Sequence, residues 1–100
     1  MGRTSRAVDA LPETVREVRA TPVFDEITLP KGLRQSHRTR ADTWGRIEVL
    51  EGRLRYVILE PEREEHELTP GAPGVITPGA AHEVEPLGPV RFRVVFLRAE

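Results

Sequence analysis

Hydrophobic and polar residues alternate along much of the chain, with a period of two that is typical of half-buried β-strands. The alternation is clearest from position 44 to 50, where Ile47 and Val49 share one face and Arg46, Glu48 and Leu50 lie on the other. The same period continues over Leu54–Leu59 and over Val90–Leu97. These runs predict strands with one face turned toward a core.

Glycine and proline separate the predicted strands. Glu51-Gly52 resembles a tight turn, so 44–50 and 54–59 are expected to form a hairpin. A charged loop is predicted over Pro61–Glu67. Further Pro-Gly turns flank a short strand at Val75-Ile76, and the second of them, Pro78-Gly79, leads toward His82.

The N-terminal part is less clearly patterned. Positions 1–10 are small and polar and are expected to form a flexible tail before a single domain over 11–100. Asp9–Arg19 fits either a helix that begins near Pro12 or an extended segment that ends at Thr21-Pro22. Pro30 and Gly32 then predict a turn before an extended run.

Together these signals predict an all-β domain. Strands and turns alternate every eight to twelve residues, which is the pattern of a β-sandwich or barrel. One hundred residues make one domain with a modest core and room for one pocket.

Composition excludes several classes of function. The net charge of -1 argues against a nucleic-acid-binding protein. The absence of cysteine excludes disulfides, thiolate nucleophiles and Cys-based zinc sites. No apolar run is long enough to cross a membrane, and the N-terminus has no apolar signal-peptide segment, so a cytoplasmic protein is expected.

The three histidines are the main candidates for chemistry. His66 lies in an acidic run and is expected to be a solvated loop residue. His37 would share a strand face with Thr39, and His82 would begin a strand after a turn. If both open onto the interior from non-adjacent strands, they could hold a metal ion; otherwise they are ordinary residues at the rim.

Two aromatic residues are candidates for lining the same pocket. Trp44 could stack on a ligand or cover the mouth of a barrel. Tyr56 could donate a hydrogen bond into the pocket or pack with Leu54 and Ile58, and packing is favoured for both aromatic residues.

Several motifs resemble those of the cupins. The run Trp44–Leu54 resembles the first cupin motif, and Gly74–His82 resembles the second, in which a turn leads to a metal-binding histidine. More narrowly, the chain resembles the TehB/YeaR-like cupin family, which is associated with tellurite resistance. The stretches that carry this resemblance are Thr21–Phe24, His37–Arg40 with Thr43–Gly45, and His82–Leu87.

The resemblance covers about residues 12 to 98 and implies a cupin-type double-stranded β-helix, a jelly-roll barrel. Two of the usual four cupin metal ligands are replaced here, by Thr39 and Gly45. His37 and His82 remain, and Glu85 is a further candidate, although alternation places it on the opposite face. The implied cofactor is a divalent metal ion, with zinc, nickel, iron and manganese all open.

Longer relatives carry a methyltransferase domain after this unit, so the chain is expected to be the accessory cupin domain without methyl-transfer chemistry. The predicted function is a metal-binding barrel that binds or transforms a small molecule or an oxyanion. A metal-free domain that binds a small ligand or a protein is the alternative. No nucleophile–base pair is visible, so the sequence predicts no reaction. Pairing of edge strands predicts a homodimer.

Overall fold

The computed structural model describes residues 11–12 and 14–99, and nearly all of their regular structure is β. The predicted tail over positions 1–10 lies outside the described residues. Within them the one helical segment is a 3-10 turn, η1 (Lys31–Arg34). The strands are β1 (Val15–Ala20), β2 (Phe24–Asp25), β3 (His37–Arg38), β4 (Trp44–Ile58), β5 (Glu64–Leu68), β6 (Gly74–Ile76) and β7 (Ala81–Ala99). The predicted β-rich fold is confirmed.

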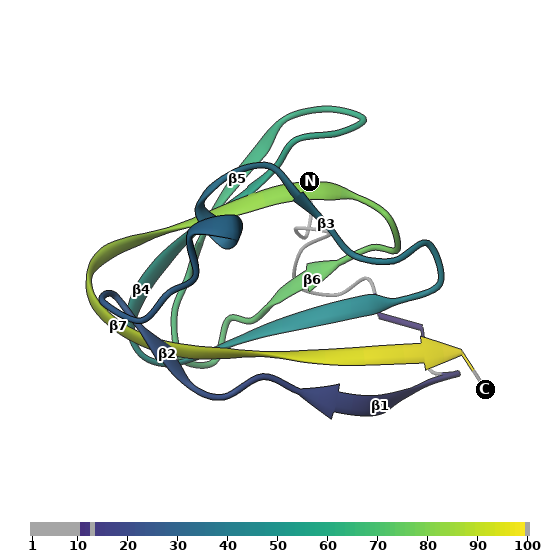
Figure 1. Cartoon of the computed structure of the whole chain (residues 1–100), viewed down its shortest axis with the longest axis horizontal. Coiled ribbons are helices and arrows are strands. Elements are labelled where there is room, and N and C mark those ends of the chain that lie inside the picture. The colour runs from purple at the N-terminus through teal and green to yellow at the C-terminus, as the bar shows by residue number, and fades with distance from the viewer. Residues whose placement is uncertain (1–10, 13, 100) are drawn as a thin grey trace, which may run out of the picture.

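The strands form one antiparallel sheet in the order β1-β7-β4-β5, with β2 and β3 also paired to β7 and β6 paired to β4. The path ends at β1 on one side and β5 on the other, so the sheet is open. The closed jelly-roll barrel predicted from sequence is therefore not confirmed. The long strands β4 and β7 both bend, and the sheet folds over on itself. Figure 1 shows its two halves facing each other across the interior.

The hairpin predicted at Glu51-Gly52 is wrong, because β4 runs continuously through this point. Gly52 has φ 83, and the pairing of β4 with β7 shifts register on both sides of it. Leu50 is an extra residue between the pairs Val49↔Phe92 and Glu51↔Arg91. A glycine at positive φ thus makes a β-bulge and a bend here, where the sequence also suited a turn.

The bulge changes which positions face the core. Before it, Ile47 and Val49 are buried; after it, Leu54 and Tyr56 are buried. A single inserted residue shifts a period of two by one position, so odd positions face inward before the bulge and even positions after it.

Strand β7 also joins two segments that the sequence separates. It runs unbroken from Ala81 to Ala99 and bends where Gly88 has φ 115. In Figure 1 its first half lies along the upper part of the sheet and its second half along the lower part. The segments Ala81–Glu85 and Val90–Leu97 therefore belong to one strand that crosses both halves of the sheet.

Other segments differ from the prediction in detail. For the segment before Thr21, a helix and an extended strand were both possible, and the structure has the strand, β1, at Val15–Ala20. The predicted charged loop over Pro61–Glu67 is wrong in its second half, because Glu64–Leu68 forms β5 and pairs with the end of β4. Leu68 is the buried end of that strand, and its burial favours pairing despite the acidic neighbours.

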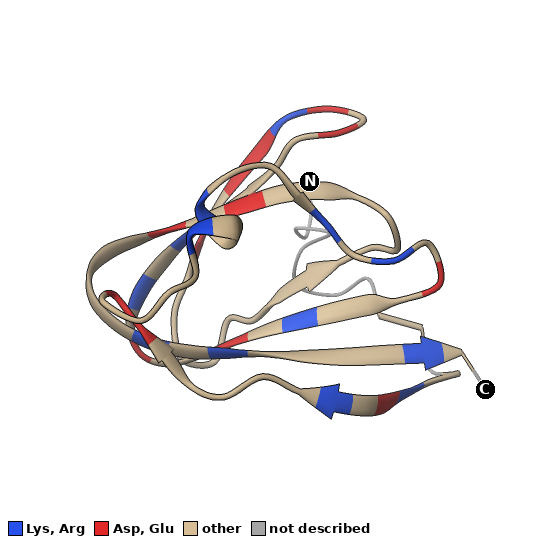
Figure 2. Ribbon diagram, in the orientation of Figure 1, with Lys and Arg blue, Asp and Glu red and all other residues tan. Residues whose placement is uncertain are grey.

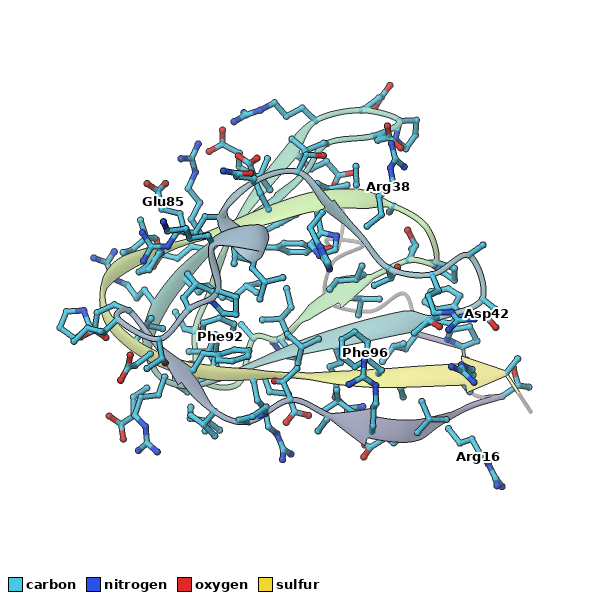
Figure 3. All side chains as sticks on the ribbon, in the orientation of Figure 1. Arg16, Arg38, Asp42, Glu85, Phe92 and Phe96 are labelled. Carbon is cyan, nitrogen blue, oxygen red and sulfur yellow. The ribbon has the colours of Figure 1, made fainter. Side chains whose placement is uncertain are left out.

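The core lies between the two halves of the bent sheet. It consists of buried apolar side chains that come mostly from β4 and β7: Leu29, Ile47, Val49, Leu54, Tyr56, Leu68, Ile76, Val84, Val90, Phe92 and Val94. Phe92 is fully buried and packs against Phe24, with ring centroids 5.7 Å apart. Figure 3 shows Phe92 on the inner side of β7.

Among the described strands, β1 and β5 are the edges of the sheet, and an edge strand can pair with another chain. The homodimer expected from sequence remains a prediction. No helix in residues 11–12 and 14–99 is long and apolar enough to span a bilayer.

Candidate ligand-binding site

A partly open cavity of about 260 Å³ lies on the inner side of the bent sheet. Its walls are mainly apolar, and they include Phe24, Leu33, Ile47, Ile76, Phe92 and Val94. The polar side chains that reach it are Thr21, His37, Thr39 and His82. A concave, mostly apolar space with a few polar groups is the usual form of a small-molecule site, and the volume of this one is slightly below the usual range of about 300–1,000 Å³.

His37 and His82 meet in this cavity. They are directly opposite partners on the antiparallel strands β3 and β7, so their side chains emerge on the same face. Their ring centroids lie 5.3 Å apart, and the rings meet edge to face at 86°. The sequence predicted that both would open onto the interior, and the structure brings them together from adjacent strands instead of separate ones.

His82 is neutral and fixed in orientation. Its side chain is buried, and burial is the main reason that its pKa lies below the ordinary 6.5, with the nearby His37 acting in the same direction. Its Nδ1 lies 3.1 Å from the carbonyl oxygen of Ala80. A carbonyl only accepts, so Nδ1 carries the proton and Nε2 is left as a hydrogen-bond acceptor.

This buried histidine predicts a pH dependence of stability. Near neutral pH both the folded and unfolded states hold a neutral residue 82. As the pH falls through about 6.5 the unfolded chain binds a proton there and the folded chain does not, so the free energy of unfolding decreases until the lower folded pKa is reached. Urea unfolding between pH about 5.5 and 7.5 should show this fall, and His82→Gln should flatten it. An equally steep fall in His82→Gln would contradict the assignment.

Thr39 lines the cavity, and its hydroxyl is already engaged. Its Oγ1 accepts a hydrogen bond from the amide of Gly79 at 3.0 Å and lies 3.4 Å from the carbonyl oxygen of Thr77. Through these bonds the segment after β3 is tied to the turn that precedes His82. The residue therefore holds the two histidine-bearing segments in place.

Tyr56 and Trp44 are not among the residues that line this cavity. Tyr56 is buried, and its hydroxyl donates to the carbonyl oxygen of Val75 at 2.8 Å. Its ring contacts those of His82 and His66, at centroid distances of 6.1 Å and 6.2 Å. Tyr56 therefore packs against the His82 ring as a core residue, and its hydroxyl already has a hydrogen-bond partner.

His66 is not the solvated loop residue that was expected. It lies on β5, its side chain is 19% exposed, and its Nε2 is 3.1 Å from a carboxylate oxygen of Glu64. The acidic run predicted a solvated segment, but pairing of β5 with β4 places His66 opposite Tyr56.

The structure separates Glu85 from the two histidines. Its carboxylate forms an ion pair with Arg55 at 2.9 Å, and the side chain is 61% exposed. Figure 3 shows it on the outer side of the sheet. Alternation along β7 explains this, because position 85 points away from the face that His82 occupies. The nearby arginines of β7, Arg91 and Arg93, pair with Glu51 and Glu48.

The prediction of a divalent metal cofactor is wrong. Among the described residues there is no group of three or more histidine, aspartate or glutamate side chains that could hold a metal ion. The two positions where cupins usually have further metal ligands, Thr39 and Gly45, have structural roles here. The Thr39 hydroxyl accepts a hydrogen bond from the backbone, and a Cβ at Gly45 would lie only 2.9 Å from the Ile76 side chain, so no larger residue fits there. Two histidines alone do not complete a zinc, nickel, iron or manganese site.

Several cavity residues were not singled out from the sequence. For Phe92 and Val94 the sequence offers one signal, the alternation over Val90–Leu97, which puts both side chains on the same strand face. Leu33 and Phe24 carried no such signal, because they stand on a 3-10 turn and a two-residue strand whose positions depend on distant pairing.

The fold and the site define an all-β domain in which one bent antiparallel sheet has, on its inner side, a partly open apolar cavity bordered by two histidines. The chain belongs to the TehB-like domain family, whose model matches residues 19–94. The TehB-like part of the resemblance noted in the sequence is thus confirmed, whereas membership of the cupins is not.

The curated relatives are named as probable S-adenosyl-L-methionine-dependent methyltransferase TehB, from two strains of Haemophilus influenzae. They are 34% and 33% identical over 70 residues, which is 66% of this chain. The chain spans about a quarter of their length, since the match covers 24% of each.

Two solved structures are similar. The crystal structure of TehB from Haemophilus influenzae has a TM-score of 0.79 and 26% identity, covering 87% of this chain and 32% of that one. The crystal structure of a protein from Escherichia coli strain K12 has a TM-score of 0.81 and 23% identity, covering 90% of this chain and 96% of that one, and it supports the fold alone.

These comparisons correct the predicted function. The relatives are named as methyltransferases that depend on S-adenosylmethionine, so the chain's family is related to methyltransferases and the metal-binding cupin function is wrong. Membership of the TehB-like family likewise contradicts the description of this chain as a cupin and as a metal-binding protein, which was based on the two cupin-like motifs.

The cavity does not fit S-adenosylmethionine. That cofactor is large and polar and carries a sulfonium charge, whereas the cavity is small, apolar and without a carboxylate among its described lining residues. The described strands are antiparallel, with no parallel βαβ unit and no helix that follows a glycine-rich loop. No methyl-transfer step is derived from these residues.

Proposed function

We propose that this chain is a small-molecule-binding domain of a methyltransferase-related protein. The cavity holds the apolar part of the ligand, and any charged group of the ligand lies outside it. The observation that carries the proposal is the cavity itself, lined by core residues of β4 and β7 and bordered by a neutral His82. Packed protein interiors leave few spaces larger than a water molecule, so an apolar hollow of this volume is a candidate ligand site.

The composition of the walls supports a mostly apolar occupant. No acidic, lysine or arginine side chain is among the described residues that line the cavity. Burying a charged group there would leave it without a partner, which is costly, whereas each buried methylene contributes about 0.8 kcal/mol. The hydroxyls of Thr21 and Thr39 already form hydrogen bonds with the backbone, so the polar contacts left for a ligand are those of the histidines, including the Nε2 acceptor of His82.

A link to methyl transfer rests on the names of the relatives alone. The ligand would then be a molecule that a methyltransferase acts on or responds to, held by this domain while S-adenosylmethionine binds elsewhere. The domain's own contribution would be binding and orientation of that ligand.

The test is a series of primary alcohols from butan-1-ol to decan-1-ol, titrated calorimetrically into the purified chain. Affinity should rise about fourfold with each added methylene and level off when the cavity is full. S-adenosylmethionine, titrated in parallel, should give no saturable binding. Absence of saturable binding across the whole alcohol series would overturn the proposal.

A further inference from the structure

A groove rich in arginine lies next to the cavity and has no role in the fold described so far. It has a volume of about 500 Å³, and four arginines line it: Arg19, Arg38, Arg40 and Arg98. They come from β1, from β3 and the segment after it, and from the end of β7. Figure 2 shows basic positions on these segments around the open end of the sheet, on the side of the C-terminus.

The groove and the cavity share part of their walls. His37, Thr39 and Phe96 line both. The cavity and the groove therefore adjoin at these three side chains, and a ligand longer than the cavity would reach the groove past them. The apolar space ends where the arginines begin, so the two together form a site with one apolar end and one cationic end.

The positive charge of the groove is incompletely neutralised. Arg38 is held by Glu60 through two hydrogen bonds, at 2.6 Å and 2.8 Å, and its charge is balanced there. Arg40 reaches Asp42 only at 3.9 Å, and both side chains are largely exposed. Of the residues that line the groove and are described, none is acidic.

Arg19 and Arg98 are the arginines best placed to meet a ligand. The guanidinium of Arg19 lies 4.7 Å from the centroid of the Phe96 ring, which forms the border with the cavity. No carboxylate described in residues 11–12 and 14–99 lies within ion-pair distance of Arg19 or Arg98, although Arg98 is close enough to Asp42 to help lower the pKa of its carboxyl. A guanidinium stacked on an aromatic ring keeps its hydrogen-bond donors available at the edge.

We propose that the ligand of this domain is an amphipathic carboxylate, with its apolar body in the cavity and its carboxylate bound by Arg19 and Arg98 in the groove. Guanidinium groups match the planar geometry of a carboxylate and bind it through two parallel hydrogen bonds. The chain as a whole carries a net charge of -1, so the cationic groove is a local feature and not a general basic surface. This inference rests on the proposed function and names the class of its ligand.

The experiment compares octanoate with octan-1-ol by calorimetry at pH about 7.5. At about 20 mM NaCl octanoate should bind at least tenfold more tightly than the alcohol, and this advantage should shrink several-fold at about 200 mM NaCl. The double variant Arg19→Gln with Arg98→Gln should lose this advantage, so that it binds octanoate no more tightly than it binds the alcohol. Arg53→Gln, an exposed arginine outside both the cavity and the groove, is the matched control and should behave as wild type.

Each outcome separates this inference from the proposed function. If the alcohol binds and octanoate gains nothing, or if the double variant binds octanoate as wild type does, the carboxylate inference is overturned and the cavity still binds ligands. If neither compound binds, the proposed function fails as well. Arg98→Glu gives an independent check, because a reversed charge should make octanoate bind more weakly than the alcohol.

Discussion

Replacing Gly52 by alanine should destabilise the domain by about 3 kcal/mol or more. Gly52 has φ 83, and a Cβ at this position would lie 2.1 Å from the carbonyl oxygen of Pro89. The left-handed conformation alone costs an alanine about 1–2 kcal/mol, and the clash adds about 1–3 kcal/mol because the obstacle is backbone on the paired strand. The bend that brings the two halves of the sheet together depends on this close approach.

Gly71 provides the matched control for that substitution. Its φ of 90 is similar, but nothing lies within 4 Å of the position that a Cβ would take. Gly71→Ala should therefore lose only the conformational part, about 1–2 kcal/mol. Urea unfolding of both variants measures the difference, and equal losses would mean that the contact with Pro89 does not restrict the bend. For a domain with a total stability of about 5–15 kcal/mol, the Gly52 variant should also unfold at a clearly lower temperature.

Replacing Leu33 by tryptophan should weaken alcohol binding more than a hundredfold. Leu33 stands on η1 at the wall of the cavity and is only partly buried, so a larger side chain can enter the cavity without displacing the core. Excluding about four methylenes of a bound alcohol removes about 3 kcal/mol of burial, which exceeds a hundredfold in affinity. The melting temperature should stay the same or rise, because filling a cavity restores packing contacts.

The control for the Leu33 variant is Leu50→Trp, which adds the same group on the outer face. Leu50 is 44% exposed and lies outside the cavity. This variant should bind alcohols as wild type does. Calorimetric titration of both variants with octan-1-ol checks the prediction, and undiminished binding by Leu33→Trp would place the ligand elsewhere on the molecule.

The all-β character of the domain could be predicted because it depends on local pattern. Alternation with a period of two requires only that one face of each strand is buried, and positions such as Ile47, Val49, Phe92 and Val94 do face the core. The inward direction of His82 followed from the same rule, and so did the outward direction of Glu85. The motifs around the histidines were also sufficient to indicate the TehB-like family.

Only the tertiary structure decided how the strands are joined and what the site can bind. A glycine at Glu51-Gly52 suits a hairpin turn and a bulge equally well, and pairing with Val90 on β7 selects the bulge. In the sequence, His37 and His82 resemble two ligands of a metal site. The structure shows that Thr39 is hydrogen-bonded to the backbone and that the Ile76 side chain leaves no room for a larger residue at Gly45. The cavity and the arginine groove combine residues as distant in sequence as Arg19 and Arg98, whose proximity depends on the register of β1 against β7. Such contacts arise from long-range strand pairing, which a local pattern does not encode.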